Sequence, residues 1–180
     1  MTTIWIDHLP VTPIGPVWLG VSEEGLTAIY LDGTRPDLEA KIHRRFPQAR
    51  LEEDPLRTAE VCRQIEAYLD GERRTFTLPI DWRGMGDFQR RALQATAAIP
   101  YGETRSYGEI AAQVGNPRAA RAVGRAEATN PIPLVIPCHR VIGADGGLHG
   151  YGGARGLETK AWLLRLEGVT VVQSRVESRP

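Results

Sequence analysis

Apolar and polar residues alternate near the start of the chain in a pattern that predicts β-strands. Two β-prone runs, residues 16–21 and 26–31, flank the four-residue turn 22–25, which has a glycine at its end. Runs of this length around a short turn are typical of a β-hairpin. The polar stretch that follows predicts a short charged helix from Asp37 to Phe46, because a proline comes directly after it and helices usually end before proline.

A better helix is predicted over residues 55–69. Its apolar positions recur at helical spacing on one stripe, which consists of Ala59, Cys62, Ile65 and Leu69. A cysteine on such a stripe is expected to pack in the core, so we assign no chemistry to Cys62. Residues 75–80 are then predicted to form a last strand. Residues 1 to about 80 are therefore expected to form an α+β unit, in which we find no catalytic constellation.

The next part of the chain predicts helices. Asp87 is expected to cap a helix whose apolar positions follow the 3.6-residue period, namely Phe88, Ala92, Ala95 and Ile99. After a break at residues 100–104, the run Ser106–Glu109 has the composition of a capping box, in which Glu109 reaches back to Ser106. The helix that it starts is expected to end at Gly115, because glycine readily adopts the left-handed conformation of a helix end.

A further helix is predicted to follow at once, with Asn116 as its N-cap and Pro117 at its first position. Two helices joined by so short a turn are typical of a helix-turn-helix, with the second helix in the reading position. This second helix has a small apolar face, formed by Ala119, Ala122, Val123 and Ala126, and a basic face, formed by Arg118, Arg121 and Arg125. The basic face suits a nucleic-acid groove, although such a row is also typical of an ordinary solvated surface.

Charge changes this picture by singling out the second half of the chain. The 180 residues have a formal net charge of zero, with a hydrophobic share that is ordinary for a soluble globular protein. Residues 1–83 carry 10 basic and 14 acidic side chains, whereas residues 84–168 carry 10 basic and 7 acidic ones. A basic surplus in the half that contains the helix-turn-helix pattern is weak support for a polyanionic partner.

The cysteine and histidine pattern argues against disulfides and metal sites. Cys62 and Cys138 are far apart and no signal-peptide pattern precedes them, so a reducing cytoplasm is expected. No apolar run approaches the roughly 20 residues that cross a bilayer. The sequence lacks Cys-x-x-Cys and His-x-x-x-His spacings, and we therefore expect no metal.

The strongest candidate for chemistry is the octet formed by residues 136–143, which places Cys138 beside His139. Apolar runs on either side, residues 133–136 and 141–142, are expected to be buried extended segments. Only the thiolate of cysteine is strongly nucleophilic, and a neighbouring histidine is a suitable base, directly or through a water molecule. The octet alone is equally compatible with a buried, unreactive thiol.

The octet also resembles the active-site signature of the O6-alkylguanine-DNA alkyltransferases, whose core is Pro-Cys-His-Arg flanked by Ile or Val. The resemblance extends over about 80 residues. Its further motifs are Tyr101–Thr104, Ser106-Tyr107, residues 116–124, Asn130, Gly150–Gly153 and Trp162–Leu164 with Glu167-Gly168. It implies an N-terminal α/β, ribonuclease-H-like structural domain over residues 1–80. It also implies a mostly helical alkyl-acceptor and DNA-binding domain over residues 85–168, with a winged-helix-like helix-turn-helix, followed by a tail over residues 169–180.

The resemblance implies a direct-reversal DNA-repair enzyme that takes the alkyl group of O6-alkylguanine, and possibly O4-alkylthymine, irreversibly onto Cys138. The damaged nucleotide is flipped out of duplex DNA, and each molecule reacts once. His139 is implied as the base and Glu167 as its partner. Asn130 is implied to order the turn beside the cysteine, and Tyr107 to give a proton to the departing guanine. No cofactor is implied, and we expect a monomer.

The resemblance also implies which residues contact DNA and the flipped base. Arg121 is implied to fill the gap left by the base, and the other DNA contacts fall on Arg118, Ala120, Gly124 and Arg125. The base pocket is implied at Val141, Tyr151 and Gly152. One departure is that Gly152 stands where some relatives have serine, and another is that Ala154-Arg155 lengthens the segment after Tyr151.

Two other functions remain open at this point. One is a sensor that binds alkylated DNA without accepting the alkyl group, which the intact Cys138 argues against. The other is a thiol hydrolase with a triad formed by Cys138, His139 and Glu167, which predicts turnover of a small substrate and no need for the basic face.

Overall fold

The computed structural model describes residues 2–153 and 155–177. It divides into two compact units, residues 1–85 and residues 86–180. The first unit is a sheet with helices and the second is mostly helical, so the α+β prediction is confirmed. Within the described residues, no helix is long and apolar enough to cross a membrane.

The first unit is built on a four-stranded sheet. The strands are β1 (Thr3–Leu9), β2 (Val17–Ser22), β3 (Gly25–Leu31) and β4 (Arg50–Glu52), arranged in the order β3-β2-β1-β4. β1, β2 and β3 are antiparallel neighbours, and β4 pairs in parallel with β1. The predicted hairpin is confirmed as β2 and β3. Gly25 is required at its turn, because φ is +130° there and a Cβ atom would lie 2.4 Å from the Pro79 carbonyl oxygen.

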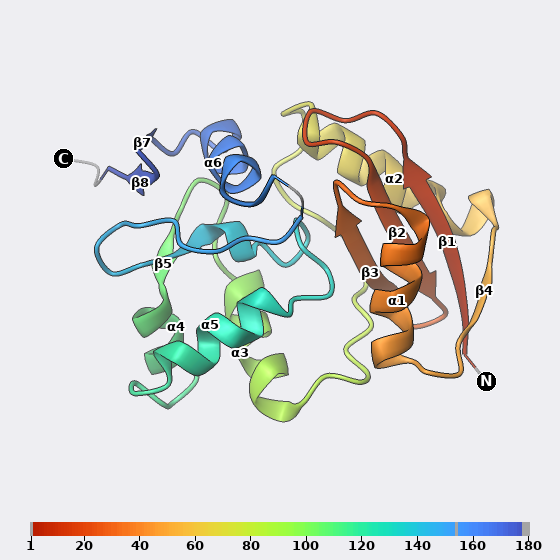
Figure 1. Ribbon diagram of the computed structural model, residues 1–180, viewed down its shortest axis with the longest axis horizontal. Coiled ribbons are helices and arrows are strands. Elements are labelled where there is room, and N and C mark those ends of the chain that lie inside the picture. The colour runs from red at the N-terminus through yellow and green to blue at the C-terminus, as the bar shows by residue number, and fades with distance from the viewer. Residues whose placement is uncertain (1, 154, 178–180) are drawn as a thin grey trace. The chain divides into compact units, whose positions relative to one another are not determined.

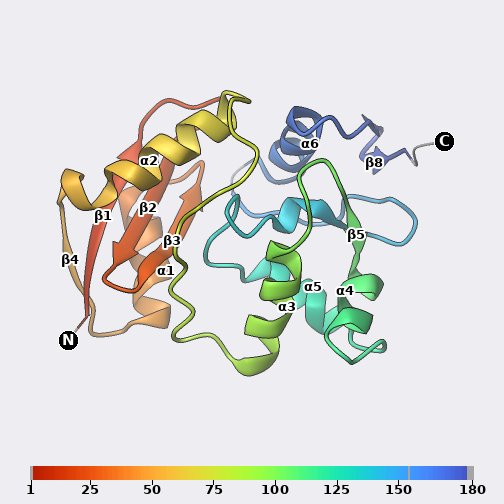
Figure 2. The same cartoon turned by 180° about the vertical axis from the view of Figure 1, so that it is seen from behind.

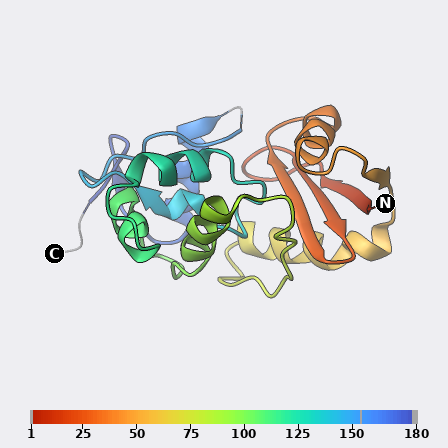
Figure 3. The same ribbon diagram turned by 90° about the horizontal axis from the view of Figure 1, so that it is seen from below.

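Helices α1 (Arg35–Arg45) and α2 (Pro55–Leu69) cover opposite faces of this sheet (Figures 1, 2 and 3). α1 starts two residues before the predicted position, because Thr34 forms a capping box with Asp37. α2 has the predicted bounds, and Asp54 caps it. A buried cluster lies between α1 and the sheet, formed by Ile4, Ile6, Ala28, Leu38 and Ile42.

Two expectations for the first unit are wrong in part. Residues 75–80 are not a strand, since a single bridge joins Ile80 to Leu26. The buried face of α2 is also turned from the predicted stripe: Ala59 is exposed and Cys62 is only partly buried. The buried positions of α2 are Thr58, Val61, Gln64, Ile65, Tyr68 and Leu69. Burial raises the pKa of Cys62 to about 12, in keeping with a thiol that does no chemistry.

The second unit contains four α-helices and short pieces of strand among its described residues. The helices are α3 (Asp87–Ala97), α4 (Tyr107–Gln113), α5 (Ala120–Ala128) and α6 (Gly156–Leu166). Strands β5 (Arg105–Ser106) and β6 (Val141–Ile142) pair in parallel, and the 3₁₀ turn η1 (Cys138–Arg140) directly precedes β6.

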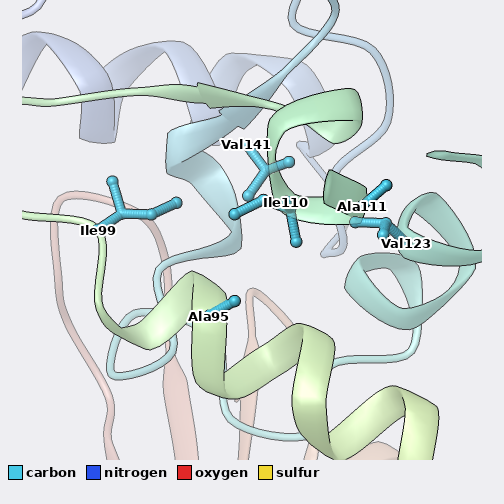
Figure 4. Close-up of a cluster of buried hydrophobic side chains, with 6 residues drawn as sticks. All are labelled: Ala95, Ile99, Ile110, Ala111, Val123 and Val141. Atoms are coloured by element: carbon cyan, nitrogen blue, oxygen red, sulfur yellow. The ribbon is translucent and has the colours of Figure 1, made fainter. Parts of the chain in front are cut away.

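The core of this unit joins α3, α4, α5 and β6. Its buried side chains are Ala95, Ile99, Ile110, Ala111, Val123 and Val141 (Figure 4). The capping box is confirmed, since the Glu109 amide donates to Ser106 Oγ and the Ser106 amide donates to the Glu109 carboxylate. Gly115 has φ of +81° at the end of α4, as expected for a left-handed stop. This core and this cap together fix the position of α4.

Three local expectations for the second unit are wrong. Gly86 is the N-cap of α3, and Asp87 is instead in its first turn. α5 begins at Ala120 and not at Pro117, because the Ala119 amide donates to the Asn116 carbonyl and closes a turn there. Residues 133–136 form a turn, in which Leu134 has φ of +73°, so they are not extended.

Residues 169–177, which the sequence suggests as a tail, form a two-stranded hairpin. Its strands are β7 (Val171–Val172) and β8 (Arg175–Val176). The hairpin adds to a second buried cluster of the unit, which is formed by Ile142, Leu148, Ala161, Leu164, Val169 and Val171. It is therefore packed against α6 and β6.

Candidate active site

Cys138 is the first residue of η1, and its side chain is 7% exposed. A buried asparagine shapes the turn before it: Asn130 Nδ2 donates to the Ile136 carbonyl at 2.9 Å, and its Oδ1 accepts from the Ile132 amide at 2.9 Å. The Cys138 amide donates to the Ile136 carbonyl at 2.8 Å. Asn130 thus links both ends of the turn that precedes the cysteine. The family resemblance implies this ordering role for Asn130.

His139 is fully buried and lies beside a carboxylate. Its Nε2 atom is 2.8 Å from Glu167 Oε1. Glu167 follows α6 as its C-cap, and it is buried as well. Because an ionised carboxylate only accepts hydrogen bonds, Nε2 carries the hydrogen and Nδ1 is the basic nitrogen of the neutral ring. Two of the predicted site residues, 28 positions apart in sequence, are therefore in contact.

Arg140 completes this group. It donates to both oxygens of Glu167, from Nη2 to Oε1 at 2.8 Å and from Nε to Oε2 at 2.9 Å. It also donates to the Ile99 carbonyl at 2.5 Å, and the Gly102 amide donates to Glu167 Oε2 at 3.0 Å. With all these donors, Glu167 has a single orientation, and so does the imidazole that it holds.

The charges of the group follow from burial and these contacts. Burial lowers the pKa of His139, and the neighbouring Glu167 carboxylate offsets part of that effect. Burial by itself would raise the pKa of Glu167, but the hydrogen bonds and charges of His139 and Arg140 hold it well below its usual range. At neutral pH the group therefore contains a neutral imidazole, which can accept a proton, held by an ionised carboxylate.

A buried lysine, Lys160 of α6, is a further charged group near Cys138. Its Nζ atom donates to the carbonyls of Val141 and Leu148, both at 2.6 Å, and the residue is fully buried. Burial lowers its pKa to about 8, against the opposing attraction of Cys138 and Glu127. A cation beside the cysteine stabilises a thiolate, which is the reactive form.

Tyr107 is the first residue of α4, and it packs partly buried against the core. Burial raises the pKa of Tyr107, and the negative charges of Glu127 and Cys138 raise it further. The phenol of Tyr107 is therefore protonated at neutral pH.

Two of the three arginines of the predicted basic face lie on α5, and the third lies before it. Arg121 and Arg125 are exposed on α5, whereas Arg118 is exposed in the turn before the helix. Arg121 and Arg125 line a cleft of about 510 Å³ between α3 and α5, and the remaining lining residues are Phe88, Gln89, Ala122, Ala126 and Thr129. Ala122 is exposed, so its assignment to the packed apolar face is wrong, while Val123 and Ala126 are buried as predicted.

The small residues of α5 have different surroundings. Ala120 is the first residue of the helix and is half-buried. Gly124 faces Tyr107, since a Cβ atom on it would lie 3.8 Å from two atoms of the tyrosine ring. Gly124 thus allows α5 to pack closely on the start of α4.

The three residues expected at a base pocket lie in the same unit. Val141 is buried, and its carbonyl already accepts from Lys160. The Tyr151 ring stands edge-on to His139, with 6.5 Å between ring centroids, and Gly152 is exposed. Ala154, in the lengthened segment, lies outside the described residues. Within the part of the chain that the structure describes, no group of three or more His, Cys, Asp or Glu side chains is arranged to hold a metal ion.

Sequence reasoning missed Arg140, Lys160 and Glu127. Arg140 belongs to the Pro-Cys-His-Arg motif, which was a usable signal. Lys160 and Glu127 interrupt the apolar stripes of α6 and α5, and both are buried in the structure. Charged residues are almost never fully buried unless they are paired, so their position on an inner helix face was the available signal.

Comparisons with known proteins identify the family to which this chain is similar. The family model described as the ribonuclease-like domain of 6-O-methylguanine DNA methyltransferase matches residues 8–82, and the model of the DNA binding domain of the same family matches residues 87–169. The methylated-DNA–protein-cysteine methyltransferase of Methanosarcina acetivorans is 45% identical over 157 residues, which are 87% of this chain and 94% of that protein.

Solved structures give the same result. The crystal structure of Mycobacterium tuberculosis O6-methylguanine methyltransferase is similar with a TM-score of 0.76 and 41% identity, over 91% of this chain and 92% of that one. A structure of Mycobacterium tuberculosis OGT in complex with DNA is similar with a TM-score of 0.73 and 40% identity, over 92% of both chains. The chain therefore belongs to the methylated-DNA–protein-cysteine methyltransferase family.

Proposed function

We propose that this chain repairs duplex DNA by moving the alkyl group of O6-alkylguanine irreversibly onto Cys138. The observation that carries the proposal is the buried contact between His139 and Glu167 directly beside that cysteine. Membership of the family and its DNA-bound relative support DNA as the partner. The reaction needs a reduced thiol, which fits a reducing cytoplasm. We propose that the protein acts as a monomer.

The first step is activation of the thiol. The Cys138 proton passes, through a water molecule, to Nδ1 of the neutral His139 ring. Glu167 stabilises the imidazolium that forms, and the nearby Lys160 ammonium stabilises the thiolate. Glu167 remains ionised throughout this step.

The second step is transfer of the alkyl group. The sulfur attacks the alkyl carbon, the bond from that carbon to O6 breaks, and its electron pair remains on guanine. Tyr107 gives its hydroxyl proton to the guanine ring, because a neutral base is the better leaving group. The thioether is not hydrolysed under mild conditions, so one molecule reacts once. O4-alkylthymine is a second possible substrate of the same chemistry.

Attack on an alkyl group within the base stack requires that the nucleotide be flipped out. This costs a few kcal/mol, and less for a weakly paired damaged base. We propose that Arg121 fills the gap, that Arg118 and Arg125 contact phosphates, and that Ala120 and Gly124 allow a close approach of the helix. Val141, Tyr151 and Gly152 would border the flipped base.

The test is incubation with duplex DNA that carries O6-methylguanine, followed by mass spectrometry of the peptide that contains Cys138. We expect a gain of one methyl group per molecule on that peptide. Cys138→Ala should bind the lesion without any gain, and Cys62→Ala should behave as the unchanged protein. Lesion binding without methylation would instead support a sensor, and the absence of both would support a thiol hydrolase.

A further inference from the structure

Glu127, near the end of α5, is a buried acid that the proposed reaction leaves without a role. Its side chain is 8% exposed, and Oε1 lies 2.6 Å from the Thr96 hydroxyl of α3. The second oxygen, Oε2, is buried and has no hydrogen-bond partner within residues 2–153 and 155–177. Burial of a carboxyl oxygen without a donor is costly for the ionised form, so the protonated form of Glu127 is favoured.

The surroundings of Glu127 connect it to Tyr107. The Tyr107 ring packs against Gly124, and residues three positions apart on a helix are neighbours on one face. The Tyr107 ring and the Glu127 carboxyl group therefore lie on the same side of α5. The Thr96 hydroxyl of α3 contacts Glu127 directly. Lys160 of α6 and Tyr107 of α4 are close enough for their electrostatic interactions with Glu127 to shift pKa values.

The buried Oε2 atom without a donor indicates that Glu127 is neutral. The Thr96 hydroxyl lies within hydrogen-bond distance of both Glu127 Oε1, at 2.6 Å, and the Ala92 carbonyl, at 3.1 Å. The hydroxyl donates to Oε1, so the proton of the acid belongs on Oε2, because a buried Oε2 without any donor disfavours the ionised form. In agreement, burial raises the pKa of Glu127 to about 7, while Thr96 and Lys160 oppose the rise.

We propose that Glu127 is a positioning residue that acts through Tyr107, by supplying the proton that replaces the one Tyr107 gives to the departing guanine. This rests on the proposed function, in which Tyr107 is the proton donor. The O–H bond of the Glu127 carboxyl breaks and the O–H bond of Tyr107 forms again. The negative charge moves from the phenolate to the carboxylate, where the Thr96 hydroxyl and the Lys160 ammonium stabilise it.

The direction of this transfer follows from the acidities of the two groups. A phenolate with the ordinary pKa of 10 holds a proton about a thousandfold more tightly than a carboxylate with a pKa of about 7, and the pKa of Tyr107 is raised above its ordinary value. Without Glu127 a phenolate would develop close to Cys138 during the transfer. Glu127 thus removes a charge that opposes loss of the guanine.

The experiment compares two methyl donors that differ in their need for a proton. Methyl transfer to Cys138 from duplex O6-methylguanine requires protonation of the leaving base, whereas transfer from methyl iodide releases iodide and requires none. Single-turnover rates with both donors are measured for the unchanged protein and for Glu127→Gln, which keeps the size of the side chain. DNA affinity is measured separately, so that weak binding is not mistaken for slow transfer.

We expect Glu127→Gln to slow transfer from DNA about tenfold or more at pH 6, with the methyl iodide rate unchanged within about twofold. The ratio of the two proteins' rates on DNA should approach one as the pH rises through about 7, where Glu127 loses its proton. Thr96→Val removes the hydroxyl that lowers the pKa of Glu127, so it should move this midpoint to higher pH.

Equal slowing with both donors would assign Glu127 to structure alone and overturn the inference. An unchanged rate on DNA would overturn it too. Failure of the unchanged protein to take the methyl group from DNA would instead reject the proposed function, and the inference with it. The two failures are therefore distinguishable.

Discussion

Glu167 is the residue on which the orientation of His139 depends, and its charge also neutralises Arg140. We predict that Glu167→Gln destabilises the protein by about 3–5 kcal/mol, because Arg140 becomes a buried cation without a counter-charge. Transfer to Cys138 should slow as well, since an amide does not stabilise the imidazolium. Urea unfolding and single-turnover transfer measure the two effects.

The matched control is Glu103→Gln, because Glu103 forms an exposed ion pair with Arg105 at 2.8 Å. Exposed pairs contribute less than about 1 kcal/mol, so this variant should retain nearly full stability. Similar losses in the two variants would contradict the assignment of a special role to Glu167.

At the scale of elements, Ser106 determines where α4 begins and hence where Tyr107 is placed. We predict that Ser106→Ala costs about 1 kcal/mol of stability, the usual effect of losing an N-cap. Tyr107 is the next residue, so transfer from DNA should slow while the methyl iodide reaction of Cys138 does not. A loss of stability with full transfer activity would show that packing against the core, and not the cap, positions Tyr107.

The exposed arginines of the helix-turn-helix predict a salt dependence. Replacing Arg125 by alanine should weaken DNA binding equally for damaged and undamaged duplexes, and should reduce the slope of log K against log salt by about 0.9 if the residue contacts a phosphate. Arg90→Ala is the control, since Arg90 pairs with Asp87 on α3 at 3.2 Å. Equal slopes for Arg125→Ala and the unchanged protein would remove Arg125 from the interface.

The elements also show which parts of the fold were predictable from sequence. The capping box of Ser106 and Glu109 is a local hydrogen-bond pattern, so its prediction is confirmed. The start of α5 was misplaced because Asn116-Pro117 is equally favourable for a turn, and the Ala119 amide closes such a turn on the Asn116 carbonyl. Residues 75–80 have strand propensity, but in the described part of the chain their β-pairing is limited to one bridge between Ile80 and Leu26.

The site was predictable where a motif covers it and not where distant residues meet. Cys138 and His139 are adjacent in sequence, and the family resemblance supplied Glu167. The burial of Lys160 and Glu127 depends on the packing of α3, α4, α5 and α6 together. No local pattern encodes such packing, and the chemistry of these two residues became visible only in the folded chain.

At the scale of the whole molecule, two buried carboxyls should give the stability opposite dependences on pH. The folded-state pKa of Glu167 lies below the ordinary value of 4.5, so its contribution is present above that pH and is lost as the pH falls. The folded-state pKa of Glu127 is raised to about 7, so its contribution is present below pH 4.5 and is lost as the pH rises from 4.5 to about 7.

We therefore predict that Glu127→Gln gains stability relative to the unchanged protein between pH 4.5 and 7, by roughly 3 kcal/mol in total, and by no more at higher pH. The amide never ionises, so it avoids the cost of a buried charge. Urea unfolding at a series of pH values measures the difference, with Glu158→Gln on the exposed side of α6 as the control. Parallel stability curves for Glu127→Gln and the unchanged protein would show that Glu127 is ionised in the folded chain, and the acid would then have no proton to give to Tyr107.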